Sequence, residues 1–134
     1  MCIRDRVIAV DTLPERHITS SKLNYDRDNI EYVIMDVYNQ PWNFEHMDIV
    51  FIDCVHDYAH VKSDIENSLK YGKGTIIAFD DYGLFPELKK AIDEYIEAGV
   101  LKLETYLGMP AGTNFPKTLY KKLKDWEGLV CQVM

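Results

Sequence analysis

Two short apolar runs, each ending in aspartate, constrain the fold of this chain more than any other feature. Residues 49–52 run directly into Asp53, and residues 74–79 run directly into Asp80 and Asp81. Apolar runs of this length, bounded by polar residues, indicate strands buried in a sheet. Both predicted strands therefore carry carboxylates at their carboxyl-terminal ends.

The segment between the two runs is typical of an amphipathic helix. Asp57 stands where a helix N-cap is expected, and Gly72 stands where the helix would stop. Four apolar residues recur at helical spacing between them: Tyr58, Val61, Ile65 and Leu69. A helix that joins two buried strands forms a parallel β-α-β unit, and sheets of this kind bind ligands at the carboxyl ends of their strands.

The rest of the chain continues the alternation of strands and helices. It predicts further strands over residues 7–10, 30–35, 100–107 and 128–133, and helices over residues 14–23 and from Pro86 to about Gly99. This pattern favours an α/β fold with a doubly wound, mostly parallel, Rossmann-like sheet between two layers of helices.

Composition excludes several classes of partner. The net charge of −7 argues against nucleic acid, because binding a phosphate backbone needs clustered basic residues. No apolar run approaches the length of a membrane span. Cys2, Cys54 and Cys131 lack metal-like spacing, which favours reduced thiols and a cytoplasmic location.

Residues 1–6 resemble translated adapter sequence at the ends of metagenomic reading frames, so we expect the domain to occupy residues 7–134.

The acids at the strand ends are the candidate binding residues. Capping a loop is the simplest role for any one aspartate, but four acid-ended strands in one sheet favour a ligand crevice. Asp11, at the end of an early strand, suits the hydroxyls of a ribose. The Asp36 carboxylate and the Val37 backbone could bind an adenine.

A second group suits a divalent cation and proton transfer. We expect Asp53 and Asp80 on neighbouring strands, where their mutual repulsion would be offset by Mg²⁺, with Asp81 as a third ligand. His56 follows Asp53 closely, and its ordinary pKa suits a general base. A bond to the backbone at the helix entry is an equally simple role for His56, whereas His17, His46 and His60 are expected at the surface.

Both motifs resemble those of class I S-adenosylmethionine-dependent methyltransferases. The similar subgroup has a strand ending Ile-Asp-Gly-x-His-x-Tyr, which stands here as residues 52–58, and a later Gly-Gly-x-Ile-x-x-x-Asp-Asp-Tyr, which stands here as residues 73–82. Cys54 and Lys73 replace glycines of these motifs. The resemblance implies strand order 3-2-1-4-5-7-6 with an antiparallel last strand, and an enzyme that methylates a small hydroxylated acceptor. It also implies cofactor contacts at Asp11, Asp36, Val37 and Asp53, catalysis by His56 and Asp53, and Mg²⁺ at Asp53, Asp80 and Asp81.

The first strand of that family and its Gly-x-Gly loop have no counterpart here, so the resemblance implies a fragment lacking the central strand. Copies could then associate through exposed strand edges. Two other functions fit the same pattern: a non-catalytic Rossmann-like domain that binds nucleotides or a partner, and a fragment of a nicotinamide-dependent oxidoreductase. The latter gives no reason for the Asp80-Asp81 pair.

The absent glycine loop generates a test. The methionine end of S-adenosylmethionine would lack its cradle, so this chain alone is expected to bind the cofactor weakly and to transfer no methyl group. Titration calorimetry measures the affinity, and binding in the low micromolar range would contradict this expectation.

Overall fold

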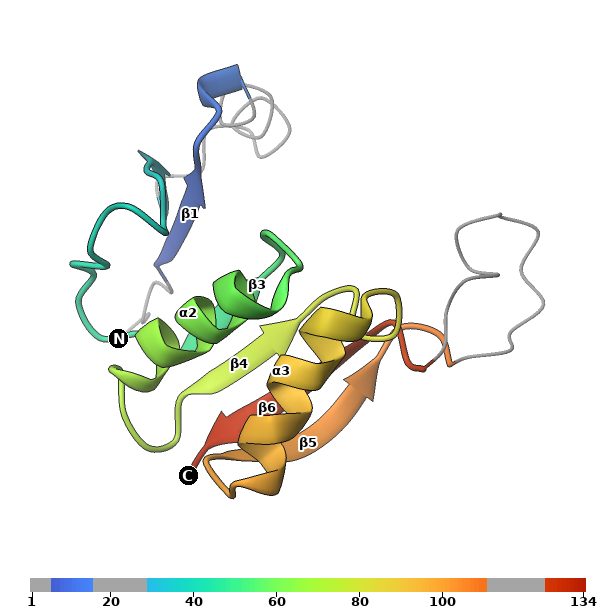
Figure 1. The fold of residues 1–134 in the computed structure, drawn as a ribbon. Helices are drawn as coiled ribbons and strands as arrows, with labels where there is room; N and C mark the ends of the chain where they lie inside the picture. The colour runs from blue at the N-terminus through green and yellow to red at the C-terminus, as the bar shows by residue number, and fades with distance from the viewer. Residues whose placement is uncertain (1–5, 16–28, 111–124) are drawn as a thin grey trace. The chain divides into compact units, whose positions relative to one another are not determined.

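The computed structural model describes residues 6–15, 29–110 and 125–134 (Figure 1). The chain forms two compact units, Met1–Asn43 and Phe44–Met134. Residues 1–5, His17 and most of the helix expected over residues 14–23 lie outside the described residues.

The first unit contains two parallel strands, β1 (Val7–Asp11) and β2 (Ile30–Ile34). They pair in register from Val7 opposite Ile30 to Asp11 opposite Ile34. Both strands were predicted from their apolar runs, and the pairing agrees with the first two places in the expected strand order.

The second unit contains a four-stranded sheet in the order β3-β4-β6-β5. The β3 and β4 strands are parallel, whereas β6 is antiparallel to both β4 and β5. This is the order expected for the last four strands, with the final strand inserted antiparallel. The bounds are β3 (Ile49–Ile52), β4 (Ile76–Phe79), β5 (Leu101–Leu107) and β6 (Gly128–Val133).

Two helices, α2 (Tyr58–Leu69) and α3 (Pro86–Glu97), lie side by side on one face of this sheet (Figure 1). Each begins and ends for a local reason. The Asp57 side chain accepts a hydrogen bond from the backbone N–H of His60 at the start of α2, and Pro86 opens α3, where a missing N–H costs nothing. No described helix is long and apolar enough to cross a membrane.

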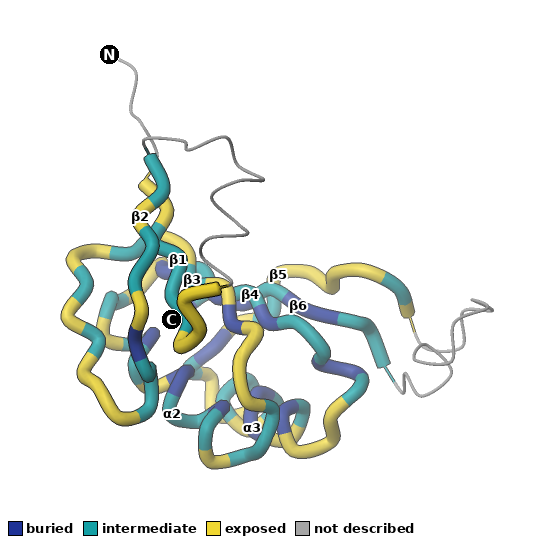
Figure 2. The backbone as a smooth tube through the Cα atoms, turned by 90° about the horizontal axis from the view of Figure 1, so that it is seen from above, coloured by how far each residue is buried: buried dark blue, intermediate teal, exposed yellow. Residues whose placement is uncertain are grey.

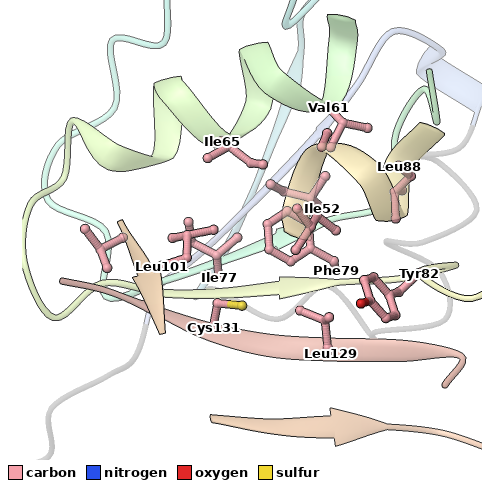
Figure 3. Packing of buried hydrophobic residues seen from close by; sticks show 13 residues of the cluster. Ile52, Val61, Ile65, Ile77, Phe79, Tyr82, Leu88, Leu101, Leu129 and Cys131 are labelled. Carbon is pink, nitrogen blue, oxygen red and sulfur yellow. The ribbon is translucent and has the colours of Figure 1, made fainter. Parts of the chain in front are cut away.

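The core lies between the helices and the sheet. Buried residues alternate with less buried ones along α2 and α3, as Figure 2 shows. Strand side chains alternate between the two faces of a sheet, so every second residue of a strand can meet the helices. The buried side chains in Figure 3 include Ile52, Val61, Ile65, Ile77, Phe79, Leu88, Leu101, Leu129 and Cys131.

The opposite face of the sheet is less covered. On β3, Ile49 and Phe51 are 66% and 63% exposed. Both described helices of this unit cover the other face, so two of the three expected layers are present among its described residues.

The N-cap of α2 generates a prediction about stability. The hydrogen bond from the His60 backbone, followed by that from the His60 side chain, lowers the pKa of Asp57 below 3.8. A lowered carboxyl pKa stabilises the fold above the unfolded pKa, and this stabilisation disappears as the pH falls through the folded pKa. Asp57→Ala should therefore lower the melting temperature at neutral pH, with a difference from the unmodified chain that narrows in acid.

Asp57→Asn is the matched control, because asparagine caps helices about as well as aspartate. It should retain most of the melting temperature at neutral pH in thermal unfolding followed by circular dichroism. Equal losses in the two variants would assign the stabilisation to the charge of Asp57 and not to its capping hydrogen bond.

Candidate functional site

The two acid-ended loops of the second unit lie next to each other. Asp53 directly follows β3, and Asp80 and Asp81 directly follow β4. Ile52 pairs with Phe79 at the ends of these parallel strands, and the Asp80 backbone N–H donates to the Ile52 carbonyl at 3.1 Å. The strand pairing brings these loops to one edge, as the sequence predicted.

Three side chains from these loops form a compact group. The Nε2 atom of His56 lies 3.7 Å from an oxygen of Asp53 and 3.5 Å from an oxygen of Asp81. One ligand atom from each residue lies within 4.8 Å of the other two. The Nε2 atom is buried and has no hydrogen-bond partner among the described residues. The two carboxylate oxygens and the ring nitrogen are suitable ligand atoms for a divalent cation.

Asp80 plays a different part. One of its carboxylate oxygens accepts a hydrogen bond from the backbone N–H of Asp81 at 2.8 Å. Of the three carboxylates expected to bind a metal ion, the structure thus gathers Asp53 and Asp81 with His56, and it turns Asp80 toward the backbone of the same loop.

Asp81 combines a left-handed backbone with surroundings that disfavour its charged form. Its φ of 59° makes it the one non-glycine residue with a positive φ among the described residues. Burial, followed by the charge of Asp80, raises its pKa, and the charge of Asp53 acts the same way, whereas His56 opposes the shift. An ionised carboxylate here is stabilised by a nearby positive charge.

A shallow cavity of about 460 Å³, largely open to solvent, lies beside His56. The His56 ring stacks on the ring of Phe85 with centroids 4.3 Å apart and planes 10° from parallel. Phe85 is exposed and stands directly before α3. The sequence reasoning missed it, although a large apolar residue at a helix N-cap without a capping side chain was a usable signal. The cavity is lined by Val55, His56, Asp57, Phe85, Pro86 and Glu87.

A polar network holds the other side of the loop that follows β4. The buried Tyr82 donates its hydroxyl hydrogen to Asp93 at 2.5 Å, and Lys89 donates to the same hydroxyl at 2.6 Å. Lys89 also pairs with Asp125 at 3.0 Å. Burial and the bond to Asp93 raise the pKa of Tyr82 to about 12. Tyr82 therefore anchors the loop as a neutral core residue.

The candidate cofactor residues of the first unit lie at the carboxyl ends of its strands. One Asp11 oxygen accepts from the backbone N–H of Leu13 at 2.9 Å. Asp36, which follows β2, accepts from the backbone N–H groups of the two residues at positions 38 and 39. The Val37 carbonyl accepts from the Trp42 indole at 2.9 Å. These contacts shape the local turns.

Comparison with solved structures shows the fold. The N-methyltransferase NodS of Bradyrhizobium japonicum, in complex with S-adenosyl-L-homocysteine, aligns with a TM-score of 0.67 at 13% identity, over 96% of this chain and 66% of NodS. An O-methyltransferase of Bacillus cereus, also with S-adenosyl-L-homocysteine, aligns with a TM-score of 0.61 at 16% identity, over 96% and 62%. Fibrillarin of Methanococcus jannaschii, a pre-rRNA processing protein, aligns with a TM-score of 0.63 at 21% identity, over 96% of this chain and 56% of fibrillarin.

The chain spans less than two thirds of the length of each of these three proteins. No curated protein has a significantly similar sequence. A family model described as a methyltransferase domain matches residues 3–82, which is more than half of the chain and includes both acid-ended strands of the second unit. The chain therefore belongs to this methyltransferase domain family.

Proposed function

We propose that this chain is part of an S-adenosylmethionine-dependent methyltransferase that methylates a hydroxyl oxygen of a small acceptor with the help of a divalent cation. The observation that carries the proposal is the group formed by Asp53, His56 and Asp81 at the carboxyl ends of β3 and β4. The match to a methyltransferase domain family favours a methyltransferase over a nicotinamide-dependent oxidoreductase.

The cofactor proposal rests on the fold. Structures of the same fold hold S-adenosyl-L-homocysteine. In this chain Asp11, Asp36, Val37 and Asp53 are the proposed contacts, because they lie at or just after strand ends, where Rossmann-like sheets bind nucleotides. The Asp11 carboxylate would accept from ribose hydroxyls, and Asp36 would accept from the adenine amino group.

The acceptor would enter the cavity beside His56. Its volume of about 460 Å³ lies within the range of small-molecule sites. Val55, Phe85 and Pro86 give it apolar walls, and His56 connects it to the two carboxylates. An acceptor that contacts these walls could thus place a hydroxyl group next to Asp53, His56 and Asp81.

The residues of the site suit activation of that hydroxyl. Asp53 and Asp81 would hold the cation, which when bound would supply Lewis-acid stabilisation of the developing oxyanion. His56 would contribute in one of two ways, as the base that takes the proton or as a third ligand. Orientation of the hydroxyl oxygen toward the methyl carbon by the cavity walls would provide much of the remaining acceleration.

A non-catalytic binding domain is the second candidate. The observation that favours it is the use of the Asp11 and Asp36 carboxylates by their own turns, as in ordinary loop caps. It offers no reason for a buried histidine nitrogen between two carboxylates.

Cation binding is the first expected outcome. Mn²⁺ or Mg²⁺ should raise the melting temperature, because a ligand that binds only the folded state stabilises it by about 2.7 kcal/mol at roughly 100 times its Kd. Asp53→Asn and Asp81→Asn should each remove most of this shift. Asp48→Asn is the control, because Asp48 is exposed and pairs with His46 away from the group. If the cation raised the melting temperature equally in the unmodified chain and in all three variants, this would contradict a site at Asp53 and Asp81.

Methyl transfer is the second expected outcome. The longest reading frame from the source genome that contains this chain should convert hydroxylated acceptors to methyl ethers with labelled S-adenosylmethionine. Asp53→Asn should lower the rate by roughly a hundredfold or more, the usual effect of removing one electrostatic contribution to catalysis. Mass spectrometry of the product distinguishes methyl ethers from methylamines. Labelled amines alone would contradict transfer to oxygen, and no labelled product with any acceptor would favour the binding domain.

A further inference from the structure

We propose that His56 is itself a ligand of the cation, so that one imidazole and two carboxylates hold a transition-metal ion such as Mn²⁺. The inference rests on the cation proposed above and deepens it. It replaces the expected set of Asp53, Asp80 and Asp81 with Asp53, His56 and Asp81, and it assigns His56 to the ion instead of to the proton of the acceptor.

The position of the His56 Nε2 atom is the main observation. This atom is buried and makes no hydrogen bond to any described residue, although buried ring nitrogens are normally paired. It faces carboxylate oxygens at 3.5 and 3.7 Å, which is beyond ordinary hydrogen-bond length. Atoms that bind one ion at about 2.0 to 2.3 Å lie roughly 2.8 to 3.8 Å apart at octahedral or tetrahedral angles. The spacing fits shared ligands.

The His56 ring is fixed in this orientation from outside the group. It stacks on the Phe85 ring: the ring centroids are 4.3 Å apart, and the ring planes are 10° from parallel. The side chain as a whole is only 22% exposed. Metal ligands are commonly oriented by neighbours that do not touch the metal ion, and an apolar neighbour also limits access of water. Phe85 would thus act as a positioning residue for His56.

Asp80 is the weaker candidate for third ligand. Its carboxylate accepts the Asp81 backbone N–H at 2.8 Å, and this bond closes the turn in which Asp81 has a positive φ. The group of ligand atoms that lie within 4.8 Å of one another contains Asp53, His56 and Asp81, and Asp80 is not part of it. Asp80 instead holds Asp81 in place, which makes it a positioning residue.

The donor set has a consequence for the choice of metal ion. Carboxylates suit Mg²⁺ and Mn²⁺, whereas an imidazole suits transition metals and adds little for Mg²⁺. A site with one imidazole should bind Mn²⁺ more tightly than Mg²⁺. His56→Asn, which offers an amide oxygen in place of the ring nitrogen, should weaken Mn²⁺ binding by about tenfold or more, and Mg²⁺ binding much less.

Pulsed electron paramagnetic resonance of the full chain with one equivalent of Mn²⁺ tests the ligand directly. The spectrum should show coupling to an imidazole nitrogen, and His56→Asn should remove it. His46→Asn is the matched control, because His46 is an exposed histidine that also pairs with an aspartate, at 2.9 Å. Circular dichroism verifies that each variant is folded, and Asp80→Asn should keep the nitrogen coupling.

Other outcomes overturn the inference. Nitrogen coupling that persists in His56→Asn, or that disappears in His46→Asn, would assign the ion to another histidine. Mn²⁺ bound without nitrogen coupling would return His56 to the role of base while keeping the cation. Absence of any Mn²⁺ binding would overturn both this inference and cation assistance, whereas methyl transfer is measured independently from the labelled product.

Discussion

The parallel pairing of β3 with β4 is the constraint on which the candidate site depends. Parallel strands end at the same edge, so Asp53 and the Asp80-Asp81 pair must meet once Ile52 is opposite Phe79. The pairing in turn requires α2 as the crossover, since two parallel strands need a long connection. Packing of α2 and α3 on Ile52, Ile77 and Phe79 then fixes the strands that carry the acids.

The elements of the second unit were predictable because each has a local cause. Periodicity, an N-cap and a terminating glycine define α2, and a proline opens α3. The strand order came from resemblance to a family, since pairing between distant strands leaves no local trace. The division of the chain after Asn43 was not anticipated, because no linker-like composition marks it.

The site was predictable only to the level of the loops. A sequence places Asp80 and Asp81 after one strand, but it does not reveal which carboxylate turns toward the backbone. That choice depends on the φ of Asp81 and on a hydrogen bond 2.8 Å long. The contact between His56 and Phe85 joins residues from two different loops, and only the folded chain brings these rings together.

The backbone of Asp81 has a consequence for how this sequence can drift. A left-handed conformation restricts position 81 to glycine, asparagine or aspartate, and burial beside Asp80 and Asp53 disfavours a negative charge there. The charge alone therefore pushes this position away from aspartate, unless a positive partner keeps it there. In a lineage where the site had fallen out of use, glycine at position 81 would be gained without loss. Such a glycine would mark a copy of this domain whose loop no longer offers a ligand atom at that position.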